Sequence, residues 1–310
     1  MNKKRKTIAL GIGFSVSLLL GGCFEMKSSE NQLTEESKSK SKVEEDYYIS
    51  VQEYTGQGYK LPNGEKTDKI AKEYRKEIDK AVKKFFQEKY KTEVIVHNTV
   101  GAVDGATVFV ESVGEPHFYT YAIIPIDVDE EEVLSDQVWS QEGEVENAIM
   151  AGVYGMIYEE EFNKLDQYLD SIVKEHPVTG IRQEALEKVA GGKFSTPYYY
   201  VNAIEYEFDA LLKEYLKNPH MEKATWKEKF KGATFNPEGL LITLDLYMSK
   251  PNTEPDKVIF DKIVSDIKNM EGLPSGAYSI ILNDNLISKR SARGTKDNSL
   301  RSADPDYIIK

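Results

Sequence analysis

Two histidines and two glutamates carry the side chains in this sequence best suited to acid–base or metal chemistry. His97 and His117 fall on or beside neighbouring predicted strands, with Glu111 and Glu115 close to them. Imidazole and carboxylate groups bind metal ions and transfer protons in catalysis. A metal or acid–base site at these residues is the sharpest catalytic hypothesis. Their spacing fits no specific ligand pattern, so we predict turn and surface histidines and assign no catalytic, cofactor-binding or metal-ligating residue.

Aromatic side chains form a second set of candidates. Residues 198–200 are three consecutive tyrosines, and Tyr119, Tyr121 and Trp139 could join them. Tyrosine is enriched at recognition surfaces, so these residues could line a groove for a peptide or a glycan. Alternation along strands buries about half of such side chains, which makes packing in the core the default interpretation.

The only cysteine, Cys23, stands where a signal peptide would be cleaved. Basic residues 3–6 precede an apolar segment, residues 8–20, and Gly21 and Gly22 come directly before Cys23. This order is typical of a secretory signal peptide. It resembles a bacterial lipobox, in which the cysteine thiol receives a diacylglycerol and becomes the mature N-terminus. We therefore predict a signal peptide at residues 1–22 and lipidation at Cys23.

Two other interpretations of this segment are weaker. A transmembrane helix needs about 20 apolar residues, and residues 8–20 are too few. A plain secretory signal would require the only cysteine to fall at the cleavage point by chance. With Cys23 lipidated, no thiol remains for nucleophilic catalysis or for an intramolecular disulfide.

Composition limits the partners of the chain. Its 310 residues include 52 Asp and Glu against 40 Lys and Arg, a formal net charge of −12. Nucleic-acid binding needs clustered basic side chains, so we predict none. The lipid rather than electrostatic attraction must then hold the protein at the membrane. The sequence lacks the Gly-x-Ser-x-Gly, His-Glu-x-x-His, phosphate-loop and Gly-x-Gly-x-x-Gly motifs, which argues against an enzyme and implies no cofactor.

The chain divides by composition. Residues 23–46 are rich in Ser, Glu, Lys and Asn and are predicted to be a disordered tether. Residues 47–287 form an α+β globular region, either as one domain or as two subdomains, 47–140 and 141–287. Residues 288–310 are predicted to be a polar C-terminal tail that frays.

The globular region is predicted to begin with a helix packed on an antiparallel three-strand meander. The helix covers residues 67–91, and the strands cover residues 92–103, 106–113 and 118–128, with Asp104 and Gly105 in the first turn. A helical segment follows at residues 142–174, in two pieces whose apolar faces change phase near 159–161. Further expected elements are helices at 181–190 and 203–218 and a C-terminal β-α-β unit, with strands at 239–248 and 277–282.

Three segments resemble a known family. They are residues 54–65 (YTGQGYKLPNGE), 101–106 (GAVDGA) and 110–121 (VESVGEPHFYTY). They are similar to a family of uncharacterised Gram-positive lipoproteins of the Bacillus/Staphylococcus type, classed as a domain of unknown function. The resemblance covers roughly residues 47–300. It implies membrane anchoring through Cys23 and offers no catalytic residues.

We therefore expect a lipid-anchored protein on the extracellular face of the cell membrane. A binding or interaction module is the leading hypothesis, with an envelope protein, a peptide or a glycan as its partner. The alternatives are an envelope-associated hydrolase with a carboxylate or histidine site, and an inhibitor or structural partner of another exported protein.

Overall fold

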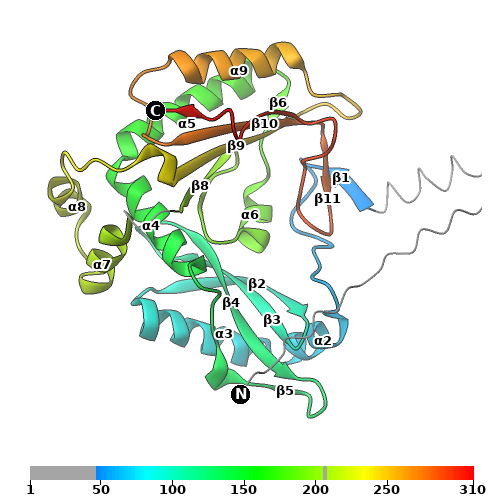
Figure 1. Ribbon diagram of the computed structural model, residues 1–310. Coiled ribbons are helices and arrows are strands. Elements are labelled where there is room, and N and C mark those ends of the chain that lie inside the picture. The colour runs from blue at the N-terminus through cyan, green and yellow to red at the C-terminus, as the bar shows by residue number, and fades with distance from the viewer. Residues whose placement is uncertain (1–46, 205–207) are drawn as a thin grey trace, which may run out of the picture. The chain divides into compact units, whose positions relative to one another are not determined.

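The computed structural model of the protein describes residues 47–204 and 208–310. The predicted signal peptide, the tether and Cys23 lie outside the described residues. The described part mixes helices with antiparallel and parallel strands, which confirms the predicted α+β class (Figure 1). Its main hydrophobic cluster takes side chains from both large sheets and from the helices between them. A second, smaller cluster contains Val51, Tyr54, Ala185, Tyr247 and Ile287.

The first sheet contains the predicted meander. Strands β2 (Val94–Ala102), β3 (Gly105–Ser112) and β4 (Tyr119–Asp127) pair antiparallel, and the short β5 (Glu132–Val133) extends them. One face packs on helices α2 (Glu65–Glu73) and α3 (Arg75–Phe85) through buried apolar side chains from every second strand position. The other face points away from these helices.

The turn between β2 and β3 lies one residue earlier than predicted. Ala102 pairs with Gly105, so Val103 and Asp104 form the turn, and of the two only Asp104 has a positive φ (54°). Gly105 belongs to the strand instead. A Cβ at Gly105 would lie 2.8 Å from the carbonyl oxygen of Ile124, so this glycine serves close strand packing rather than turn geometry.

The predicted single helix over residues 67–91 is interrupted. It breaks at Tyr74 between α2 and α3, and it ends in a π-helical turn, Phe86–Tyr90, before Lys91 adopts a left-handed conformation. The wider last turn leaves both Phe86 and Tyr90 buried in the core.

The second sheet contains the predicted β-α-β unit. Strand β9 (Leu240–Met248) and strand β10 (Ala277–Asn283) are parallel and are connected by α9 (Lys257–Asn269). Asp256 caps this helix by accepting from two backbone amides. The sheet continues through β8 (Tyr199–Ala203) to β7 (Phe194–Ser195), and β6 (Val178–Thr179) pairs with β9.

Helices α4 (Glu144–Ile157) and α5 (Glu159–Glu175) match the predicted two-piece helical segment, because the break at Tyr158 falls at the predicted change of phase. Helix α7 (Asp209–Lys217) starts later than predicted, since residues 199–203 extend as β8. Residues 220–237, for which the sequence predicts no element, contain α8 (Lys223–Lys229), whose Trp226 is buried.

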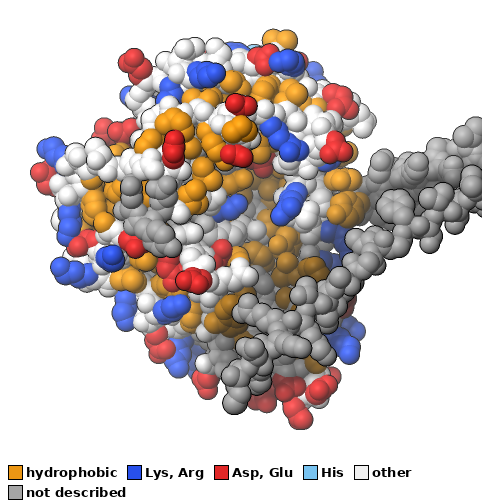
Figure 2. All heavy atoms as spheres, in the orientation of Figure 1, with side chains coloured by type: hydrophobic (Ala, Val, Ile, Leu, Met, Phe, Trp, Pro, Cys, Tyr) orange, Lys and Arg blue, Asp and Glu red, His pale blue; other side chains and the backbone are white. Residues whose placement is uncertain are grey.

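The C-terminal residues do not fray. Strand β11 (Leu286–Ser288) pairs with β1 (Tyr48–Ser50), and both β12 (Leu300–Ser302) and β13 (Ile308–Ile309) pair with β10. The sequence does not predict these strands because each is only two or three residues long and lies in a polar segment. On the face in Figure 2, acidic and basic side chains are interspersed rather than separated by sign.

Candidate functional site

A polar face of the second sheet provides the starting point. In β9, residues 240, 242, 244 and 246 are apolar and buried in the core. Side chains alternate along a strand, so Thr243, Asp245 and Tyr247 share the opposite face. Tyr200 of β8 pairs with Thr243, and Ser195 of β7 pairs with Tyr200, so all of these side chains lie on one face.

Lys193 connects this face to the first sheet. Its backbone forms an antiparallel bridge with Tyr119 of β4, and Tyr119 in turn pairs with Glu111 of β3. Directly opposed residues place their side chains on the same face. Glu111, Tyr119 and Lys193 therefore form a row that continues the polar face from one sheet to the other.

Helix α6 (Gln183–Val189) covers the junction, and it lies between the second sheet and strands β2 and β3 (Figure 1). Its first turn reaches the row, because Gln183 Nε2 donates to the Tyr119 hydroxyl at 2.6 Å. Its last turn, with Leu186 and Val189, contributes instead to the wall of a cavity.

The cavity has a volume of about 470 Å³ and lies between the end of α6, strands β7 to β9 and residues 291–295. This size falls within the range of roughly 300–1,000 Å³ that is common for small-molecule sites. Its wall combines two basic groups, one carboxyl group and tyrosine rings: Lys193, Arg293, Asp245, Tyr198, Tyr200 and Tyr247.

Lys193 places a charged ammonium group in a partly buried position. Its Nζ lies 3.8 Å from the centroid of the Tyr200 ring, and within the described part of the chain the ammonium has no hydrogen-bond acceptor and no ion pair. Burial lowers the pKa of Lys193, although the negative charges of Asp245 and Glu144 oppose this effect. The cavity therefore contains a half-buried cation whose donors face no acceptor.

Asp245 lies on the same wall. Burial raises the pKa of its carboxyl group to about 6, although a hydrogen bond from Asn283 and the charge of Lys193 act in the opposite direction. Asn283 Nδ2 donates to Asp245 Oδ1 at 2.7 Å and to the Leu246 carbonyl at 3.1 Å.

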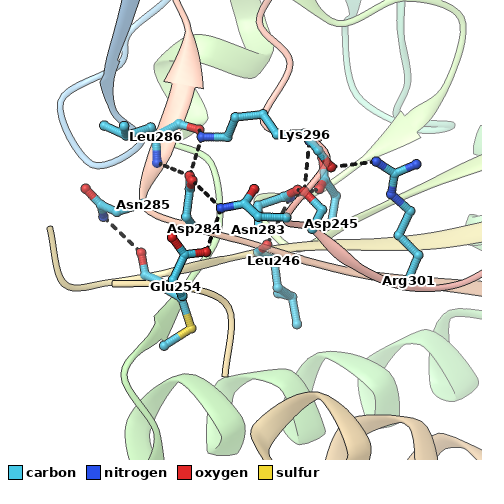
Figure 3. Close-up of polar contacts among 12 residues, drawn as sticks. Asp245, Leu246, Glu254, Asn283, Asp284, Asn285, Leu286, Lys296 and Arg301 are labelled. Carbon is cyan, nitrogen blue, oxygen red and sulfur yellow. Dashed lines mark hydrogen bonds and ion pairs between the residues drawn. The ribbon is translucent and has the colours of Figure 1, made fainter. Parts of the chain in front are cut away.

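A hydrogen-bond network holds Asn283 in place at the carboxyl ends of β9 and β10. Ser299 Oγ donates to Asn283 Oδ1 at 2.7 Å. Lys296 Nζ contacts Asp284 Oδ1 at 2.5 Å and the Leu286 carbonyl at 3.2 Å (Figure 3). These contacts fix the chain directly after residues 291–295, which line the cavity, to the ends of β10 and β11.

His97, His117 and Glu111 lie together, as the catalytic hypothesis required, although the sequence predicts turn and surface histidines. His97 Nε2 lies 2.6 Å from Glu111 Oε2, and His117 Nε2 lies 2.8 Å from Glu111 Oε1. Burial alone would raise the pKa of Glu111, but the hydrogen bonds from the two imidazoles lower it overall. Glu115 lies elsewhere and pairs with Lys223 at 3.1 Å. Across residues 47–204 and 208–310, no group of three or more His, Cys, Asp and Glu side chains is arranged to hold a metal ion.

The predicted aromatic groove is only partly assembled. Tyr198, Tyr199 and Tyr200 line the cavity. Tyr119 belongs to the row beneath α6, Tyr121 donates to Gln141 Oε1 at 2.7 Å outside the cavity, and Trp139 pairs with Ile123 at the edge of the first sheet.

Sequence reasoning missed Lys193, Asp245 and Arg293. Asp245 had a signal that could have been used, because it is the only charged residue in strand β9. Lys193 and Arg293 gave no comparable signal, since each stands beside glycines in irregular chain.

Comparison with known proteins identifies a family and a fold. The family described as "Protein of unknown function (DUF1672)" matches residues 41–310. The crystal structure of a DUF1672 family protein from Staphylococcus aureus is similar, with 19% identity, a TM-score of 0.66, and coverage of 85% of this chain and 98% of that chain. Curated proteins gave no match.

In the part of the chain that the structure describes, no helix is long and apolar enough to cross a membrane.

Proposed function

Because the chain belongs to the DUF1672 family, whose function is unknown, we propose its function from its own residues: a lipid-anchored, extracytoplasmic binding protein with its ligand in the cavity beside Lys193. Location and binding rest on different residues and are tested separately. The observation that carries the binding function is a half-buried ammonium without an acceptor in a cavity walled by tyrosines.

The location is supported by the sequence before the described residues. Basic residues 3–6, the apolar segment 8–20 and Cys23 have the order of a lipoprotein signal. Each buried methylene of an acyl chain contributes about 0.8 kcal/mol to membrane binding, so a diacylated thiol gives a stable anchor. The protein would then stand on the outer face of the cell membrane.

Binding fits the arrangement of side chains better than hydrolysis does. The cavity joins aromatic walls to a few charged groups, as small-molecule sites do. The His97–Glu111–His117 cluster, which would be the core of a hydrolytic site, has both carboxylate oxygens occupied by imidazole nitrogens. A glutamate held in this way orients the two imidazoles and supports the local structure.

The anchor is tested by intact mass and membrane fractionation of the wild type and Cys23→Ala. We expect the wild type to carry a diacylglycerol-sized addition on a chain that starts at Cys23 and to sediment with membranes. The variant should lack the addition. Wild-type protein released without modification, or one that keeps residues 1–22, would disprove the anchor.

The binding site is tested by calorimetric titration of the full chain in detergent with two probes, N,N′-diacetylchitobiose and the tripeptide Ala-Ala-Phe. We expect at least one of them to bind with Kd below about 1 mM, which corresponds to roughly 4 kcal/mol. Tyr200→Ala should weaken that binding at least tenfold, whereas Tyr74→Ala, an exposed tyrosine on the helix pair α2–α3, should not change it. Failure of both probes to bind the wild type would reject the cavity as a site for ligands of these classes.

A further inference from the structure

The charges of the cavity point to the kind of ligand it takes. We propose that it binds the carboxylate group of a ligand with an aromatic or apolar body, and that Lys193 is the residue that holds this carboxylate. This inference rests on the binding function proposed above and narrows it to one ligand chemistry.

Lys193 provides the first argument. An ammonium has three donors and no acceptor capacity, and removing it from water without a partner is costly. Lys193 is half-buried and its Nζ lies over the Tyr200 ring, while no acceptor among the described residues takes its hydrogens. A carboxylate would supply the missing acceptor and a charge-assisted hydrogen bond.

Arg293 provides the second argument. It lines the same cavity, it is an exposed residue, and it has no ion pair within the described ranges. Its positive charge acts on both Lys193 and Tyr200, which places it near them. Two basic groups therefore face the cavity against one carboxyl group, Asp245, and this excess favours an anionic ligand.

The remaining wall fits the rest of such a ligand. Tyr198 and Tyr200 add aromatic surface to the lining, and Ile181 and Leu186 add apolar surface. Asp245 Oδ1 accepts from Asn283, and the Tyr247 hydroxyl also hydrogen-bonds to this carboxyl group, whose remaining lone pairs could accept an N–H. A carboxylate next to an N–H group occurs at the C-terminus of a peptide, whereas a simple carboxylic acid provides the carboxylate alone.

Four probes separate these possibilities in calorimetric titrations of the full chain in detergent. They are 3-phenylpropionate, 3-phenylpropionamide, the tripeptide Ala-Ala-Phe with a free carboxylate, and its C-terminal amide. We expect each acid to bind at least tenfold more tightly than its amide. A peptide source is indicated if the tripeptide binds more tightly than 3-phenylpropionate, and a free acid is indicated if the order is reversed.

Variants of the lysine assign the effect to its position. Lys193→Gln should reduce the ratio of acid to amide affinity to about one, and Lys193→Arg should keep most of it because the charge remains. Lys250→Gln, a change at an exposed lysine outside the cavity, should leave the ratio unchanged. Thermal melts of each variant show whether it is folded. If Lys193→Gln does not fold, Lys193→Arg still provides a test at this position.

The outcomes distinguish the two proposals. Equal binding of acid and amide overturns the carboxylate inference and leaves the binding function in place. A preference for acids that survives Lys193→Gln overturns the role of Lys193. If no probe binds, including N,N′-diacetylchitobiose, the binding function fails together with the inference.

Discussion

Tyr119 and Lys193 form the backbone pair that joins the two sheets. The Tyr119 N–H donates to the Lys193 carbonyl at 2.8 Å, and the Lys193 N–H donates to the Tyr119 carbonyl at 2.9 Å. This bridge places the His97–Glu111–His117 cluster and the cavity side by side beneath α6. The position of Lys193 thus depends on the register of a strand pair as well as on its own surroundings.

The first prediction concerns two glycines of α4. A Cβ at Gly152 would lie 2.8 Å from the carbonyl oxygen of His117, whereas a Cβ at Gly155 would lie 3.4 Å from ring atoms of Phe194, an ordinary contact. Gly152→Ala should therefore lower the free energy of unfolding by about 1–3 kcal/mol, the cost of overpacking. Gly155→Ala should be neutral or should stabilise by up to about 1 kcal/mol through helix propensity. Urea denaturation of both variants measures the difference, and equal effects would contradict the close approach of α4 to His117.

The second prediction concerns the stability cost of Asp245. Its carboxyl pKa rises on folding from 3.8 to about 6. A raised pKa means that the ionised group destabilises the fold above pH 6, and this penalty disappears as the pH falls through 6 toward 4. Asp245→Asn removes the charge and keeps an oxygen for Asn283, so it should be more stable than the wild type at pH 8. One pKa unit corresponds to about 1.4 kcal/mol, which sets an upper limit of about 3 kcal/mol.

Other groups near Asp245 reduce the stability that Asp245→Asn gains. Lys193, Tyr200 and Tyr247 are the titratable side chains that face it, and the variant loses the attraction between Asp245 and Lys193. We expect a net gain of about 1–2 kcal/mol at pH 8 that fades below pH 5. Thermal melts at pH 8, 6.5 and 5 measure it, with exposed Asp297→Asn as the control. A variant less stable than the wild type at pH 8 would refute the prediction.

The third prediction concerns Glu111. Hydrogen bonds from His97 and His117 lower its pKa on folding, so its stabilising effect is present above the unfolded value of 4.5 and is lost as the pH falls through the lower folded value. Glu111→Gln keeps one acceptor oxygen where two imidazoles need acceptors. It should cost about 1–3 kcal/mol at pH 7 and less below pH 4. Glu160→Gln, at an exposed position, should cost nothing measurable.

The sequence could predict elements with strong periodicity. The meander, the break between α4 and α5 and the β-α-β unit follow from apolar spacing over many residues. The approach of His97, Glu111 and His117 follows from the meander as well, since neighbouring strands bring these residues together. Predictions succeeded where local pattern determines the structure.

Contacts set by distant chain segments could not be predicted in this way. The bridge between Tyr119 and Lys193 involves one residue from irregular chain, so no periodic pattern marks it. Strands β12 and β13 are too short for alternation to be visible in a polar segment. The cavity depends on both features, because residues 291–295 are held between β11 and β12.

The last prediction tests these C-terminal strands with two neighbouring isoleucines. Ile308 is 5% exposed and pairs with Tyr278 of β10, whereas Ile309 is 46% exposed. Burying an aliphatic side chain stabilises a fold by about 1.5–3 kcal/mol, and its loss also leaves a cavity. Ile308→Ala should therefore lower the free energy of unfolding by about 2 kcal/mol, while Ile309→Ala should change it by less than about 0.5 kcal/mol. Equal and small effects in urea denaturation would show that the chain end frays, as its polar composition suggests.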